Sequence, residues 1–171
     1  MTHPLEPHRL FATTVALLTS QVDGGPPNVM ACEWTMNVCW QPLKIMCVVH
    51  SSDLSHELIA TSREFGVNLC ADTQATLSHV AGSRTGRGLD KLSDHVFAHA
   101  LYPAARIRAP MILGCVLNAE CVVEQTVALG DYTGFVGRAV AVRMDPNLSP
   151  LVYHRGRYFE VGSPIARPGA A

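Results

Sequence analysis

Charged residues are scarce in this chain. Lys, Arg, Asp and Glu make up 16% of its 171 residues, and the formal net charge is −1. No basic stripe or arm is present, so nucleic acid is not expected as a partner. Hydrophobic residues make up 48% of the chain, more than so few charged side chains can screen from water. We therefore expect a second subunit or a ligand to cover part of the apolar surface.

Long hydrophobic runs are missing as well. No stretch approaches the roughly 18 apolar residues that a membrane span requires. Residues 1–6 lack the basic region and the apolar core of a secretory signal. The length of the chain fits one domain. These observations predict a single domain in the cytoplasm, without a membrane partner.

Cysteine pairs with metal or redox spacing do not occur. The six cysteines are Cys32, Cys39, Cys47, Cys70, Cys115 and Cys121. No two of them form a CxxC motif, and several lie in apolar, strand-like runs. Buried free thiols are typical of a reducing compartment, whereas disulfide frameworks belong to oxidising ones. We therefore expect free thiols and neither a disulfide framework nor structural zinc.

Sequence fingerprints of nucleotide-binding domains and of metalloenzymes are also absent. The chain contains no GxGxxG after a strand, no GxxxxGK[ST] and no HExxH. His95 and His99 are the only histidines spaced four apart, and no third ligand accompanies them nearby. No Ser-His-Asp or Cys-His pattern of an activated nucleophile is apparent. The sequence predicts no metal site and no catalytic nucleophile.

Strand-like segments dominate what is present. Apolar runs of strand length, separated by Gly, Pro and Asp, predict seven or eight strands, at residues 11–20, 28–40, 43–50, 65–70, 111–117, 118–128, 135–144 and in a last hairpin around Gly156. A Gly-Pro turn makes the first two a hairpin. Helical periodicity appears at residues 53–63 and 73–80. Because strands and helices do not alternate, we expect a mainly β fold, an antiparallel split barrel with one or two inserted helices.

Two polar clusters have the chemistry of an anion site. Ser51, Ser52 and Ser55 lie at the start of the first predicted helix, where main-chain N–H groups lack partners and the helix dipole favours negative charge. Arg87 and Lys91 follow in a Gly-rich loop and would complement a phosphate dianion. The alternatives are simple helix capping by the serines and a solvated basic loop.

Taken in order, these motifs resemble the flavin reductase-like, FMN-binding split-barrel family, which includes flavoredoxins and the reductase components of two-component monooxygenases. The matching segments are residues 11–20, 28–34, 42, 51–55, 64–68, 86–91, 109–110, 120–121 and 130–140. The match runs from about residue 10 to 162. It implies one FMN-binding domain over 1–171, with this core and a loose tail at 164–171.

The resemblance implies a flavin site along the second predicted strand. Asn28 and Trp34 are six residues apart and would lie on one face of that strand. The amide of Asn28 suits the polar edge of the flavin ring, and Trp34 would cover the ring or the ribityl chain. Main-chain groups would meet the flavin carbonyl oxygens, and the candidates are Val29, Met30, Ala31 and Cys32. The alternative for Trp34 is an aromatic residue of the barrel core.

The resemblance also implies roles for residues beyond that strand. Tyr132 would stack on the flavin or offer its hydroxyl, at a position where many family members carry a histidine beside the flavin ring. Phe159, together with Tyr158, would reach the site of a partner subunit. The alternatives are a half-buried turn tyrosine and simple packing of Phe159. Asp53 is expected to point away from the phosphate, because a carboxylate competes for the same helix N-terminus.

The function implied is reduction of FMN, or FAD, by NADH or NADPH in a homodimer whose flavin lies near the subunit interface. Reduced flavin would then pass to a partner oxygenase. The departure at Tyr132 keeps a second possibility open, a flavoredoxin-like FMN-binding carrier that receives electrons from a partner protein. A flavin-free binding protein on the same barrel is the third.

Overall fold

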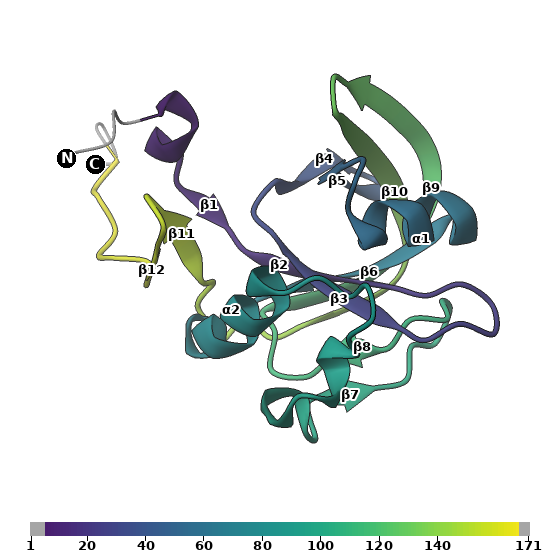
Figure 1. Cartoon of the computed structure of the whole chain (residues 1–171). Coiled ribbons are helices and arrows are strands. Elements are labelled where there is room, and N and C mark those ends of the chain that lie inside the picture. Colours follow the sequence, from purple (N-terminus) through teal and green to yellow (C-terminus); the bar gives the residue numbers. More distant parts are fainter. Residues whose placement is uncertain (1–5, 168–171) are drawn as a thin grey trace.

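The structure, a computed structural model, describes residues 6–167 of the chain. Its strands curve into a partly closed barrel with two helices against it (Figure 1). The strands are β1 (Thr13–Thr14), β2 (Ala16–Ser20), β3 (Asn28–Cys32), β4 (Thr35–Trp40), β5 (Leu43–His50), β6 (Glu64–Leu69), β7 (Leu101–Tyr102), β8 (Met111–Ile112), β9 (Leu117–Leu129), β10 (Tyr132–Met144), β11 (Val152–His154) and β12 (Arg157–Phe159). Residues 1–5 and the end of the expected tail, 168–171, lie outside the described residues.

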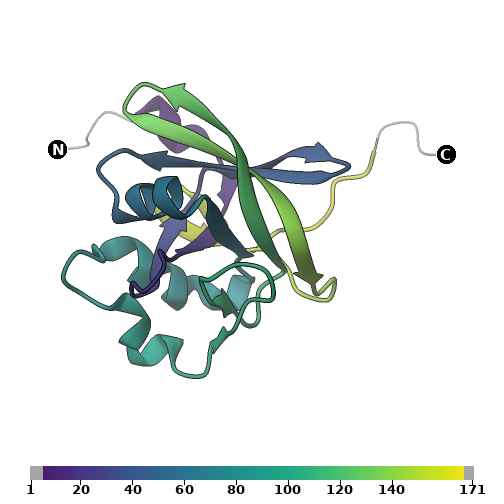
Figure 2. The ribbon, with the colours of Figure 1, turned by 90° about the vertical axis from the view of Figure 1, so that its right-hand side faces the viewer.

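Seven of these strands form the main sheet, in the order β3-β2-β6-β9-β10-β5-β4. Every neighbouring pair in it is antiparallel. Figure 2 shows its longest hairpin, β9–β10, crossing beside the β4–β5 hairpin. The edge strands β3 and β4 are consecutive in the chain, so the sheet must curl for the chain to pass from one edge to the other. The main-chain N–H of Val48 donates to the carbonyl of Trp34 at 2.9 Å and helps to close the curl.

The interior of the curl is the main hydrophobic core. It is filled by alternate residues of the strands, among them Phe65 and Phe135, because successive side chains of a strand point to opposite faces. Helix α1 (Leu54–Ser62) covers one opening and inserts Ile59 into this core. Arg63 ends α1 in the left-handed conformation. No helix of residues 6–167 is long and apolar enough to cross a bilayer.

A second core lies on the outer face of β2 and β3. Helix α2 (Ala75–Ser83) packs there, and so does the small sheet β1-β11-β12, whose Tyr153 and Tyr158 face the same core. β7 and β8 form a separate two-stranded sheet. Together, α2 and the β11–β12 hairpin give the outer face of β3 two walls (Figure 1).

The segment 28–40 is not one strand, and this expectation is wrong. The chain leaves the first edge of the sheet after Cys32, and β4 pairs with β5 at the opposite edge. Residues 113–116 also depart from the expected strand 111–117, because β8 ends at Ile112. The strand expected from Phe135 begins earlier, at Tyr132. Both predicted helices are present, the second one ending at Ser83.

Candidate functional site

Three adjoining pockets surround Ala31 on β3. We call them the loop pocket, the aromatic pocket and the tyrosine pocket. The loop and aromatic pockets share Met30, Ala31 and Asp53, and the loop and tyrosine pockets share Ala31, Gly82 and Ser83. Because they share these lining residues, we describe the three as one branched groove along the edge strand β3.

The loop pocket, of about 430 Å³, lies between β3, the start of α1 and the Gly-rich loop. Nδ2 of Asn28 donates a hydrogen bond to Oγ of Ser55 at 2.8 Å, and both side chains are buried. Gly86 closes the pocket above them, so tightly that a Cβ atom there would collide with Oδ1 of Asn28. A buried, hydrogen-bonded pair of polar side chains thus forms the floor of this pocket.

Lys91 is the cation of the loop pocket. Its side chain is buried, with 5% of the residue exposed. Nζ donates to the main-chain oxygens of Ala81 at 3.0 Å and Arg84 at 3.1 Å. Among the described residues, no carboxylate lies within ion-pair distance of it. Burial lowers the pKa of Lys91 below its usual value, and the charge of Asp53 acts in the opposite direction. A buried ammonium group without a counter-charge is costly, so this site favours an anion.

The three serines of the anion prediction separate in the structure. Ser55 lines the loop pocket, but Ser51 and Ser52 are exposed outside it. Asp53 occupies the N-cap position of α1 without forming a side-chain cap, and its main-chain oxygen accepts from the N–H groups of His56 and Glu57. The N–H groups of Leu54 and Ser55 have no main-chain partner among the described residues. Asp53 lines both the loop and aromatic pockets, and its expected orientation away from the phosphate stays a prediction.

The arginines of the Gly-rich loop form ion pairs with carboxylates that do not line the loop pocket. Arg87 forms an ion pair with Glu57 at 3.2 Å on the surface, with about half of each side chain or more exposed. It does not line the loop pocket in this structure, whereas Lys91 does. Arg84 lines the pocket and pairs with Asp94 at 2.9 Å. Lys91 is therefore the better placed of the two cations that the sequence predicted.

The aromatic pocket, of about 370 Å³, is lined by residues of β3, the end of β5 and the start of β10. The rings of Trp34 and Tyr132 lie 5.0 Å apart and are tilted by 53°. Met30, Ala31 and Cys32 line the same pocket, whereas the Val29 side chain is buried in the second core. Trp34 belongs to neither β3 nor β4, so Asn28 and Trp34 do not share a strand face, and they line different pockets.

His50 is the aromatic-pocket residue that the sequence analysis missed. It pairs with Tyr132 across β5 and β10, and the two rings are 4.9 Å apart, edge to face. The main-chain N–H of Ser52 donates to Nδ1 of His50 at 3.1 Å. Because that nitrogen accepts, the neutral imidazole carries its proton on Nε2. No described residue is hydrogen-bonded to Nε2, so a donor remains available.

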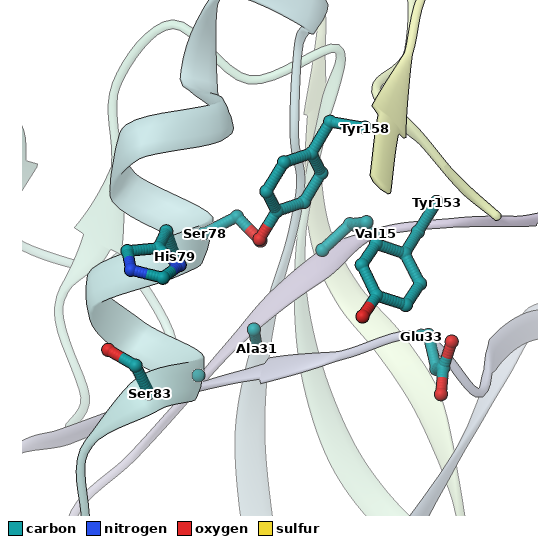
Figure 3. Close-up of a pocket in the computed structure, with 9 residues that line it drawn as sticks. Val15, Ala31, Glu33, Ser78, His79, Ser83, Tyr153 and Tyr158 are labelled. Carbon is teal, nitrogen blue, oxygen red and sulfur yellow. The ribbon is translucent and has the colours of Figure 1, made fainter. Parts of the chain in front are cut away.

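The tyrosine pocket, of about 370 Å³, lies between β3, α2 and the β11–β12 hairpin (Figure 3). The hydroxyls of Tyr158 and Ser78 are hydrogen-bonded at 3.0 Å within one chain. Phe159 points elsewhere: it is 45% exposed, lies 6.3 Å from the ring of His154, and lines none of the three pockets. Its contact with a partner subunit stays a prediction.

The cysteines do not supply reactive groups to this groove. All six are free thiols, and five are buried, as the sequence predicted. Burial is the main cause that raises the pKa of Cys32, the one that lines the aromatic pocket, and it raises that of Cys121 to about 12. A thiol with a raised pKa is a weak nucleophile at neutral pH. No three His, Cys, Asp or Glu side chains within residues 6–167 are grouped as metal ligands.

The model of the flavin reductase-like domain matches residues 8–162. The chain belongs to this family. An uncharacterised protein of Pyrococcus abyssi is 28% identical over 80% of this chain and 77% of its own. The NADH-dependent flavin reductase StyB of Pseudomonas fluorescens is 28% identical over 91% of this chain and 86% of its own. The resemblance seen in the sequence is therefore confirmed.

A solved structure agrees with this family assignment. The styrene monooxygenase flavin reductase of Pseudomonas putida S12 superposes with a TM-score of 0.76 at 26% identity, over 92% of this chain and 96% of that one. The expected fold is confirmed: mainly β, an antiparallel split barrel with two helices.

Proposed function

We propose that this protein is an NAD(P)H-dependent flavin reductase that holds the phosphate of FMN, or the corresponding phosphate of FAD, in the loop pocket. The observation that carries the proposal is Lys91, a buried cation that lines a pocket and whose partners among the described residues are main-chain carbonyls. A phosphate dianion would supply the missing counter-charge. The Ser55 hydroxyl and the N–H groups of Leu54 and Ser55 at the start of α1, two residues that line the same pocket, can add donors.

The aromatic pocket suits the flavin ring. Trp34 and Tyr132 offer ring faces, and β3 is an edge strand with no neighbour on its outer side. Every second residue of an edge strand directs its N–H and C=O groups outward. Main-chain groups between Val29 and Cys32 can therefore meet the carbonyl oxygens and ring nitrogens of a flavin. The negative charge of Asp53 lies between the two pockets and opposes the phosphate, which limits the affinity.

A flavin bound in this groove supplies the hydride-accepting chemistry. The protein supplies position, by holding the ring in the aromatic pocket, and donors that stabilise negative charge on it. Residues 8–162 form one flavin reductase-like domain, and we expect the nicotinamide to enter the same open groove. We expect weak nicotinamide binding that depends mainly on stacking against the aromatic pocket.

His50 is expected to assist the nicotinamide step. Its Nε2–H is free, and its ring lies against Tyr132, the residue that replaces the histidine of many family members. His50→Ala should lower the rate of flavin reduction by NADH about tenfold, the worth of roughly one hydrogen bond. The affinity for NAD⁺ should fall similarly, while the FMN affinity stays within twofold. Tyr132→Phe keeps the ring and serves as the matched control; equal losses in both variants would show that His50 has no separate role.

The proposed function is tested by anaerobic mixing. The purified protein is loaded with FMN and then with FAD, and each is mixed with NADH or NADPH while the flavin absorbance is followed. Bleaching by either nucleotide supports the reductase. Flavin that stays oxidised with both nucleotides, but is reduced by a partner protein, would support the flavoredoxin-like carrier. A protein that binds neither flavin would refute both. Transfer of reduced flavin to an oxygenase is the proposed next step.

We also propose a homodimer in the cytoplasm. β4 is an edge strand, and its Trp40 is 85% exposed. An exposed tryptophan on an edge strand favours association with a second subunit. Met36 and Val38 of the same strand are exposed too. Trp40→Glu should convert the dimer to a monomer in light-scattering measurements at micromolar concentration. Phe11→Glu, at an exposed aromatic residue before β1, is the control. A wild-type monomer would contradict the dimer.

A further inference from the structure

The flavin placement proposed above leaves the tyrosine pocket unoccupied. This pocket adjoins the loop pocket along a ridge of small residues that line both, Ala31, Gly82 and Ser83. At Gly82 a Cβ atom would come within 3.2 Å of the Ala31 methyl group, so α2 packs directly against β3 here, and the ridge stays low because neither residue has a longer side chain. A ligand held at Lys91 can therefore continue past it into the tyrosine pocket.

The charges are divided between the two pockets. The loop pocket is lined by the cations Lys91 and Arg84 and by the single carboxylate of Asp53. The tyrosine pocket is lined by Glu33, which also lines the aromatic pocket, and by no lysine or arginine among the described residues. The Glu33 carboxylate would repel a second phosphate there, whereas it could accept hydrogen bonds from an uncharged group with hydroxyl or amino donors. The pocket thus suits the part of a ligand that lies beyond its phosphates.

The walls of the tyrosine pocket suit a flat ring (Figure 3). Tyr153 and Tyr158 have ring centroids 5.5 Å apart, and Val15 adds an apolar surface between β3 and the hairpin. The hydrogen bond between the hydroxyls of Tyr158 and the buried Ser78 of α2 fixes the Tyr158 ring in place. Aromatic faces with hydroxyls at their ends match a purine ring with a ribose attached. A volume of about 370 Å³ is in the range of ligand pockets.

We propose that the tyrosine pocket binds the adenosine half of FAD. The inference rests on the proposed function, because the flavin ring takes the aromatic pocket and the two phosphates take the loop pocket. The order aromatic, loop, tyrosine follows the order of groups along FAD, bent around Ala31. Glu33 accepts hydrogen bonds from the ribose hydroxyls or the adenine amino group. The protein is then selective for FAD over FMN.

The test compares dissociation constants of FAD and FMN by titration. Wild-type protein should bind FAD at least tenfold more tightly than FMN. Tyr153→Ala should lower the FAD affinity about tenfold and leave the FMN affinity unchanged. Tyr102→Ala, in a partly buried tyrosine that lines none of the three pockets, is the matched control. Equal affinities of the wild-type protein for FMN and FAD would overturn this inference and leave the reductase intact.

Two further measurements keep the outcomes distinct. Free adenosine, added to wild-type protein, should weaken FAD binding but not FMN binding, and this requires no variant to fold. Adenosine is also part of NADH, so NADH affinity is measured on the FMN-loaded protein. If Tyr153→Ala weakens only NADH, the pocket belongs to the nicotinamide dinucleotide and the assignment to FAD is wrong. Failure to bind any flavin would instead overturn the proposed function.

Discussion

Replacing Lys91 by methionine is expected to lower the affinity for FMN roughly 10- to 150-fold, and to change the affinity for riboflavin little. The expected loss of about 1.5–3 kcal/mol is the worth of a hydrogen bond to a charged group. Lys91 is buried in the loop pocket and has no carboxylate partner there. Riboflavin shares the ring and the ribityl chain but lacks the phosphate, so the difference between the two ligands isolates the contact with Nζ.

The control for this variant must separate binding from stability. Lys91→Met also leaves the carbonyls of Ala81 and Arg84 without a donor, so some thermal stability will be lost. Lys44→Met removes a lysine that is paired with Glu124 at 2.8 Å and lines none of the three pockets. It should leave both flavin affinities unchanged. Equal losses of FMN and riboflavin binding in Lys91→Met would show that the phosphate lies elsewhere.

The same contact should depend on pH in a defined direction. Burial lowers the pKa of Lys91, and phosphate binding favours the cation and raises that pKa again. As pH rises through the lowered value, the free protein loses the proton, and the advantage of FMN over riboflavin declines. The ester phosphate remains a dianion over this range, because its second pKa is about 6. In Lys91→Met the difference between the two ligands should be independent of alkaline pH.

Local patterns in the sequence were sufficient for much of the fold. The apolar run at 43–50 and the helical stripe containing Leu58 and Ile59 both correspond to elements of the structure. The break between β3 and β4 could not be seen, because the residues on both sides have the composition of strands. It follows from sheet order, which places β3 and β4 at opposite edges. That order depends on pairings far apart in the sequence, which a local pattern does not contain.

The same distinction between local patterns and long-range pairing applies to the candidate site. Ser55 and Ile59 are four residues apart in α1, so helical spacing predicts that Ser55 is buried beside Ile59. The same spacing would also place Ser51 and Ser52 on that face, and they are exposed because the helix begins only at Leu54. The placement of His50 beside Tyr132 needed the β5–β10 register. Spacing alone also could not distinguish a buried lysine from a surface arginine in the Gly-rich loop.

The second large effect is expected at Gly86, where alanine should lower the FMN affinity at least tenfold. Gly86 does not have a positive φ, so alanine is compatible with its backbone, and only the added methyl group matters. That methyl would collide with Oδ1 of Asn28 and approach Cδ2 of Leu54 at 3.0 Å. Asn28 cannot turn away without breaking its bond to Ser55. The exposed Gly-rich loop should therefore move out of the loop pocket, at the typical cost of overpacking, about 1–3 kcal/mol.

Two matched variants decide whether collision with Asn28 is the cause. Gly88→Ala in the same loop meets no atom within 4 Å but has a φ of +75°, so it should cost about 1–2 kcal/mol of stability and leave FMN affinity within threefold. Asn28→Ala removes the Asn28 atoms that the new methyl would hit and leaves only the flexible end of the Leu54 side chain close to it. In Asn28→Ala/Gly86→Ala, the second substitution should then cost little beyond the first, a coupling of more than 1 kcal/mol in a double-mutant cycle. Additive losses would mean that Gly86 acts on FMN without Asn28, and that the floor of the loop pocket is not the pair described above.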